Sequence, residues 1–80
     1  MEEKDAVTRK IGEHQARLLH QGVEISYWIG PNPPGRRQIV VSLNGRDAGR
    51  SDIEEGEDAE AEMSSATLRA LENAIRGQGQ

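Results

Sequence analysis

The chain has 80 residues and a formal net charge of −4, with one Trp, one Tyr, no Phe and no Cys. It therefore forms one small domain with an aliphatic core, and it lacks disulfides, zinc–thiolate sites and thiol chemistry. The acidic balance argues against a general nucleic-acid binder. No apolar run is long enough to span a membrane or to act as a signal peptide, so we expect a soluble, cytoplasmic protein with no membrane contact.

Residues 5–21 are predicted to form a helix. Its apolar residues near helical spacing are Val7, Ile11, Leu18 and Leu19. Asp5 can cap its start and Gly22 can end it. A strand over part of this stretch is the alternative, because Gly12 disfavours the middle of a helix.

Residues 23–29 and 37–43 are predicted to be strands, because apolar and polar side chains alternate along both. The side chains expected to face the core are Val23, Ile25, Tyr27, Ile29, Ile39, Val41 and Leu43. Trp28 and Val40 then share the outer face of the sheet. The intervening residues 30–35 are rich in Gly and Pro and are predicted to form a loop.

Asn44-Gly45 is typical of a type I′ hairpin turn, which predicts that residues 46–51 pair back as a polar edge strand. Residues 52–57 carry few apolar side chains and are predicted to be a loop. A long helix is expected from about residue 58 to residue 77. Its apolar arc has Ala59, Met63, Ala66 and Ala70 on one side and Leu68, Leu71 and Ile75 on the other.

The predicted fold class is α+β, in the order α-β-β-β-α. The alternation along the strands places apolar side chains on only one face of the three-stranded antiparallel sheet. We therefore expect both helices to pack on that face. Residues 5–76 form the single domain, with residues 1–4 and 77–80 as disordered ends.

The spacing of several residues resembles that of the double-stranded RNA-binding domain. The residues that carry the resemblance are Gly22, Val23, Tyr27, Gly30, Pro31, Ile39, Val41, Leu43, Asn44, Gly45, Gly49, Ala59, Met63, Leu68 and Leu71. It covers about residues 5–76. The resemblance implies the same α-β-β-β-α fold and contact with A-form duplexes through three regions.

All three contact regions of that family differ here. The residues that could still touch RNA are Arg9, Lys10, Glu13, Asn32, Arg36 and Arg37. Asn32 stands where the family has a histidine after Gly-Pro. The lysines that open the family's last helix are replaced by Gly56, Glu57 and Glu60. The carboxylates of Glu57, Asp58 and Glu60 repel phosphate. High-affinity binding of duplex RNA is therefore not expected.

An acidic run occupies residues 52–60, formed by Asp52, Glu54, Glu55, Glu57, Asp58 and Glu60. Such a surface can occupy a basic, nucleic-acid-binding groove on another protein. The alternative is a solvated loop that only aids solubility. Gly56 comes too early for a calcium-binding loop, and no glutamate follows at the required spacing, so we expect no metal and no cofactor.

Two further surfaces are candidates for binding. Trp28 and Val40 on the outer sheet face either anchor a partner or a homodimer, or simply form a cross-strand pair. Four arginines form a predicted basic edge: Arg36, Arg37, Arg46 and Arg50. They either contact nucleic acid or guard the sheet against edge pairing.

No residue pattern indicates catalysis. His14 and His20 are not at the spacing of a helical metal pair, and Ser64 and Ser65 lack the glycines of a nucleophile elbow. We expect a non-enzymatic protein that acts through protein contacts as an adaptor or inhibitor. Its composition also suits phage-encoded inhibitors of the anti-CRISPR kind. The alternative is a weak duplex-RNA binder that uses the arginine edge and the first helix.

Overall fold

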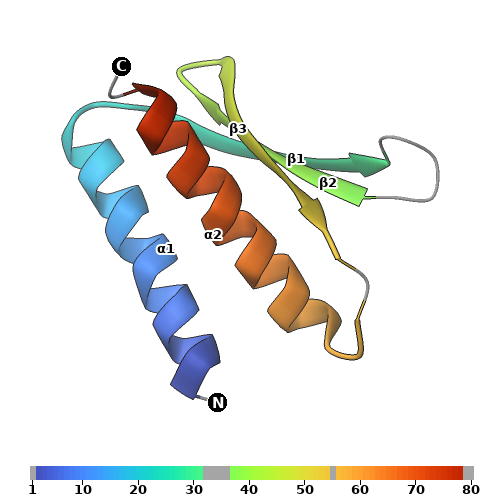
Figure 1. Ribbon diagram of the computed structural model, residues 1–80. Helices are drawn as coiled ribbons and strands as arrows, with labels where there is room; N and C mark the ends of the chain where they lie inside the picture. Colours follow the sequence, from blue (N-terminus) through green and yellow to red (C-terminus); the bar gives the residue numbers. More distant parts are fainter. Residues whose placement is uncertain (1, 32–36, 55, 79–80) are drawn as a thin grey trace.

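The computed structural model describes residues 2–31, 37–54 and 56–78 and has the predicted α-β-β-β-α order (Figure 1). The elements are α1 (Glu2–His20), β1 (Ile25–Pro31), β2 (Arg37–Leu43), β3 (Arg46–Ile53) and α2 (Ala59–Gln78). The sheet is antiparallel with the strand order β1-β2-β3. Both helices lie on one side of it, with α2 against β3 and β2 and with α1 beside α2. Neither helix has the length and apolarity to cross a membrane.

The turns form as their residues predict. Asn44 and Gly45 have φ angles of 54° and 80°, which confirms the type I′ hairpin. Gly22 ends α1 with a φ of 82°, and Val23 N donates to Leu18 O at 2.9 Å, the six-to-one hydrogen bond of a Schellman motif. At both positions, residues that tolerate a positive φ explain why the chain turns there.

Four element boundaries differ from the predicted ones by two residues or more. β1 begins at Ile25 rather than at Val23, because the amide of Val23 donates a hydrogen bond to Leu18 O at the end of α1. α1 begins at Glu2 rather than at residue 5, and β1 extends through Gly30 to Pro31, whereas residues 32–35 of the predicted loop lie outside the described residues. β3 continues to Ile53, which pairs with Arg37 and is 5% exposed. The prediction of a loop from residue 52 was therefore wrong for its first two residues, because one buried isoleucine keeps a charged stretch in the sheet.

The core lies between the inner face of the sheet and α2. Its residues are Leu18, Val23, Ile39, Val41, Leu43, Ile53, Ala66, Ala70, Leu71 and Ala74. Tyr27 and Ile29 were expected there but are 38% and 45% exposed, and Ala59 is also exposed. α1 packs chiefly on α2 and makes few contacts with β1. The part of β1 around Ile29 therefore remains uncovered.

α2 crosses β3 at Gly49 with no room for a side chain between them. A Cβ atom at Gly49 would lie 2.5 Å from Ala74 N and 3.0 Å from Ala74 Cα. Ala70 and Ala74 are fully buried at this crossing. A β-bulge beside it leaves Ala48 without a partner on β2, because Val41 pairs with Gly49 and the next pair is Ser42 with Asp47.

We expect Gly49→Ala to destabilise the domain by about 2 kcal/mol or more, because the added methyl group meets helix backbone that cannot turn aside. The matched control is Gly12→Ala in α1, where nothing lies within 4 Å of an added Cβ. That change should stabilise by about 0.5–1 kcal/mol. Urea unfolding measures both, and equal midpoints for the two variants would contradict the close crossing.

Candidate functional site

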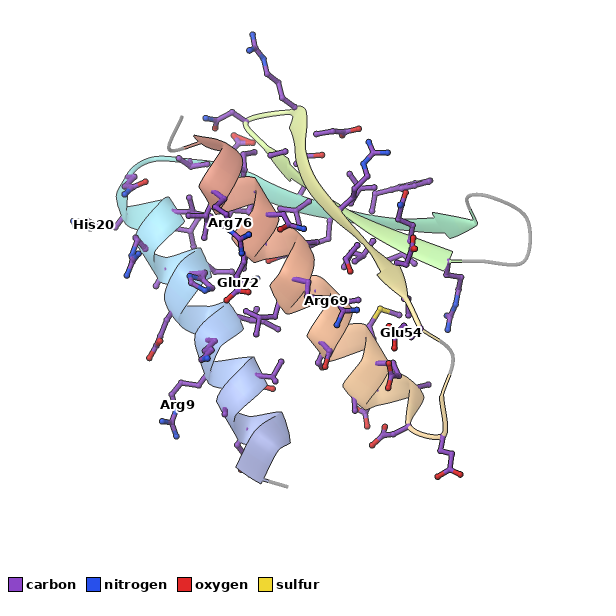
Figure 2. The ribbon with its side chains drawn as sticks, viewed as in Figure 1. Arg9, His20, Glu54, Arg69, Glu72 and Arg76 are labelled. Atoms are coloured by element: carbon purple, nitrogen blue, oxygen red, sulfur yellow. The ribbon has the colours of Figure 1, made fainter. Side chains whose placement is uncertain are left out.

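Acidic side chains gather where β3 ends and α2 begins. We call Glu54, Glu57, Asp58 and Glu60 the acidic end; all four residues are exposed. Figure 2 shows Glu54 beside the end of β3, next to the first turns of α2. Among the described residues, no basic side chain forms an ion pair with Glu54 or Glu57. Glu55 of the predicted run lies outside the described residues.

Asp58 has a structural part in the acidic end. Its Oδ1 accepts a hydrogen bond from Ala61 N at 3.1 Å, and its carbonyl oxygen accepts one from Glu62 N at 3.0 Å. Asp58 is therefore the N-cap of α2, where a carboxylate also interacts favourably with the positive end of the helix. The carboxylates of Glu54 and Glu57 are exposed beside this cap and can face a partner.

Asp52, the first residue of the predicted run, does not belong to the acidic end. It lies on β3 opposite Gln38, whose Nε2 donates to Asp52 Oδ1 at 3.4 Å. The extension of β3 to Ile53 places Asp52 on the outer face of the sheet. The acidic run of the sequence is thus divided between two surfaces.

Trp28 and Val40 lie directly opposite each other on the outer face. Trp28 is 55% exposed, whereas Val40 is 5% exposed. The indole ring folds along its own strand against Gly30, where an added Cβ would clash with it. The pair is the predicted cross-strand contact, and its exposed apolar surface comes mainly from the indole.

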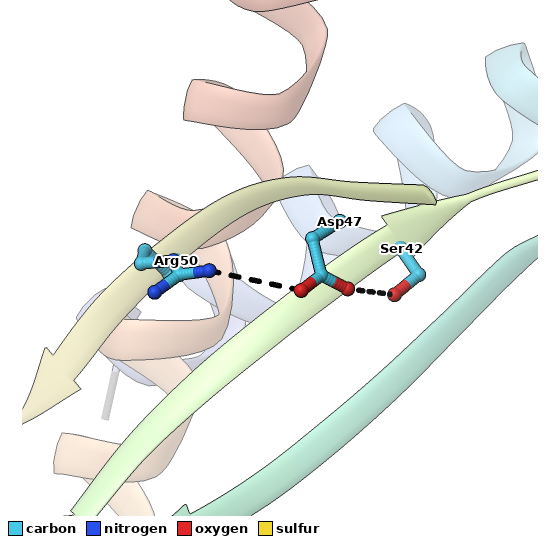
Figure 3. A network of polar contacts seen from close by, with 3 residues as sticks. All are labelled: Ser42, Asp47 and Arg50. Atoms are coloured by element: carbon cyan, nitrogen blue, oxygen red, sulfur yellow. Dashed lines mark hydrogen bonds and ion pairs between the residues drawn. The ribbon is translucent and has the colours of Figure 1, made fainter. Parts of the chain in front are cut away.

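Next to this pair, a polar network covers the outer face (Figure 3). Ser42 Oγ donates to Asp47 Oδ1 at 3.1 Å, and an Arg50 guanidinium nitrogen lies 3.7 Å from Asp47 Oδ2. Residues three apart on a regular strand face opposite sides. The bulge at Ala48 removes that difference, so Asp47 and Arg50 meet on one face.

The predicted arginine edge is not one surface. Arg37 begins β2, and Arg46 follows the hairpin turn at the other end of that strand, about 20 Å away. Arg50 lies between them and is engaged by Asp47. Arg36 and Asn32 lie outside the described residues.

The RNA-contact candidates on α1 are separate from these arginines. Arg9, Lys10 and Glu13 are all exposed. In Figure 2 the side chain of Arg9 points away from α2. The described candidates therefore lie on separate parts of the molecule.

Sequence reasoning missed two side chains of α2 that close the edge of β3. Arg69 donates through Nε to Ser51 Oγ at 3.0 Å and through a terminal nitrogen to the Asp52 carbonyl oxygen at 3.2 Å. Asn73 Nδ2 donates to the Arg50 carbonyl oxygen at 3.3 Å. The only sequence signal was that Arg69 and Asn73 are four apart on one helix face.

Both histidines lie on α1, where His14 is partly buried. His14 Nε2 lies 3.6 Å from Glu72 Oε2, so this contact links α1 to α2. His20 is exposed. In the ranges that the structure describes, no group of three His, Asp or Glu residues is placed to hold a metal ion.

An open hollow of about 680 Å³ lies between the start of β3 and the end of α2. Its charged lining consists of Arg46 and Asp47, and Asp47 is already bonded to Ser42 and Arg50. We assign no chemistry to this hollow.

Comparison with protein-family models, with characterised proteins and with solved structures finds no match to this chain.

Asp58→Ala should destabilise the protein by about 1 kcal/mol, because the amide of Ala61 loses its hydrogen-bond acceptor. The control is Glu57→Ala, which removes one adjacent carboxylate without touching the cap and should change stability by less than about 0.5 kcal/mol. Thermal unfolding followed by circular dichroism measures both. An equal loss in the two variants would mean that Asp58 is not the cap.

Proposed function

We propose that this protein is a non-enzymatic binding domain that has the α-β-β-β-α plan of the double-stranded RNA-binding domain and acts through protein contacts. The acidic end is its binding surface, and its partner is a protein with a basic, nucleic-acid-binding groove. By occupying that groove, the domain acts as an inhibitor or an adaptor.

The observation that carries this proposal is the charge at the start of α2. The helix N-terminus contributes the equivalent of about half a positive charge. The exposed carboxylates of Glu54, Glu57 and Glu60 together carry more negative charge than this half positive charge offsets. The described residues place no basic side chain against Glu54 or Glu57. An anionic surface of this kind attracts a basic groove and speeds association with it.

The alternative function, weak binding of duplex RNA, has less support. A duplex binder needs cations spaced along a phosphate track. Here Arg37 begins β2 and Arg46 begins β3 beside the other end of β2, and Arg50 is ion-paired with Asp47. The acidic end would also repel phosphates at the place where the resembled family holds them.

We predict that a duplex RNA of about 16 base pairs binds no more tightly than roughly tens of micromolar at physiological salt. A mobility-shift titration at two salt concentrations measures this. A submicromolar dissociation constant with steep salt dependence would make RNA binding the function. Glu57→Lys should tighten RNA binding, because it restores a cation at that position.

The protein partner should be captured from lysate of the source cell, with and without RNase. We expect a basic nucleic-acid-binding protein to be retained in both arms and to be lost or weakened at least tenfold by Glu57→Lys. Most of the loss should lie in the association rate, because exposed charges act on encounter.

The matched control for capture is Glu13→Lys on α1, which makes the same charge change at another exposed position. It should leave capture within about twofold of the unmodified protein. Equal loss in both variants would show that only net charge matters. Retention of the partner by Glu57→Lys would exclude the acidic end as the binding surface.

A further inference from the structure

The β3 and β1 edges of the sheet differ in whether their outward backbone groups are hydrogen-bonded. At the β3 edge, the outward carbonyl groups of Arg50 and Asp52 accept hydrogen bonds from Asn73 and Arg69 of α2. These side chains occupy acceptors that another strand would need. Edge strands with unpaired backbone groups invite pairing, and α2 blocks it at β3.

The β1 edge has no such protection. Asn44 N donates to Glu24 O at 2.8 Å, so Glu24 faces β2, and the antiparallel alternation directs the backbone groups of Ile25, Tyr27 and Ile29 outward. The same alternation correctly places Arg50 and Asp52 at the β3 edge. Among the described residues, no backbone or side-chain hydrogen bond reaches these outward groups of β1.

Apolar side chains flank this free edge on both faces. Tyr27 and Ile29 are 38% and 45% exposed on the inner face, and Trp28 is 55% exposed on the outer face. The strand Ile25–Pro31 contains no charged residue. Natural edge strands usually carry a charge or a covering element. β1 carries no charge, and α1 contacts it through a hydrogen bond from Gln15 Nε2 to the Tyr27 hydroxyl, which leaves the outward backbone groups of the edge unbonded among the described residues.

We propose that β1 pairs antiparallel with β1 of a second copy of this chain, about a twofold axis at Trp28. Tyr27 of each copy then exchanges backbone hydrogen bonds with Ile29 of the other, and the two Trp28 side chains meet on the outer face. The two sheets join into one continuous sheet. This inference is independent of the proposed function, because it uses neither the acidic end nor its partner.

Charge placement favours a second copy as the occupant. The acidic end lies at α2 and β3, on the far side of the sheet from β1. Five strand spacings, two in each copy and one between the copies, separate the acidic ends by about 24 Å, beyond the Debye length of about 8 Å at physiological salt. The strand Ile25–Pro31 of a second copy brings no charge to the pairing, and its outward backbone groups match those of the first copy about the twofold axis.

Sedimentation velocity over about 5–500 µM tests the pairing. We expect a reversible dimer with a Kd on the order of 10–100 µM, as is typical of a small interface. Ile29→Lys should raise the Kd at least tenfold, because it places a charge on each side of the axis. The control Leu19→Lys changes an equally apolar, 63% exposed residue on α1 and should leave the Kd within twofold.

Amide hydrogen exchange gives a second readout that locates the interface. The amides of Tyr27 and Ile29 should exchange more slowly as the wild-type concentration rises, and this dependence should vanish in Ile29→Lys. Trp28→Ser provides the same test if Ile29→Lys loses its fold. A monomer throughout the concentration range, or a dimer that survives both substitutions, would overturn the proposal.

Discussion

The contact between α2 and β3 at Gly49 fixes the position of the main helix, and most of the remaining structure depends on it. An added Cβ at Gly49 would lie 3.0 Å or less from the backbone of Ala74, so helix and strand meet almost backbone to backbone. Small side chains on α2 make this possible, because Ala70 and Ala74 fit where larger residues would hold the helix away. In a domain of 80 residues with few aromatic residues, such close packing supplies much of the available core.

Because α2 is committed to β3 and β2, it leaves the end of β1 to α1, which packs beside α2 instead of covering the sheet. The consequences for the two edges are opposite. Side chains of α2 reach over the β3 edge and bond its carbonyl groups, whereas no side chain bonds the outward backbone groups of Tyr27 and Ile29 among the described residues. One helix placement therefore both protects one edge and exposes the other.

The same placement sets the electrostatics of the candidate binding surface. The chain must turn from β3 into α2 at the far end of the sheet, which gathers Glu54, Glu57 and Glu60 around a helix N-terminus. Asp58, the fourth residue of the acidic end, caps the helix through its carboxylate. The acidic end thus combines a folding role and an exposed charge in neighbouring residues, and it lies well away from the free β1 edge.

The sequence by itself determined the features that depend on neighbouring residues. The alternation of apolar and polar residues predicted two strands, and Asn44-Gly45 predicted the type I′ turn. Both signals depend only on the side-chain period and the φ preferences of a few neighbouring residues. Tertiary structure alone decided that Ile53 is buried and Tyr27 exposed, that Ala48 is bulged, and that α2 closes the β3 edge. Those outcomes depend on which surface a helix covers, and an alternating pattern identifies an apolar face without stating whether another element reaches it.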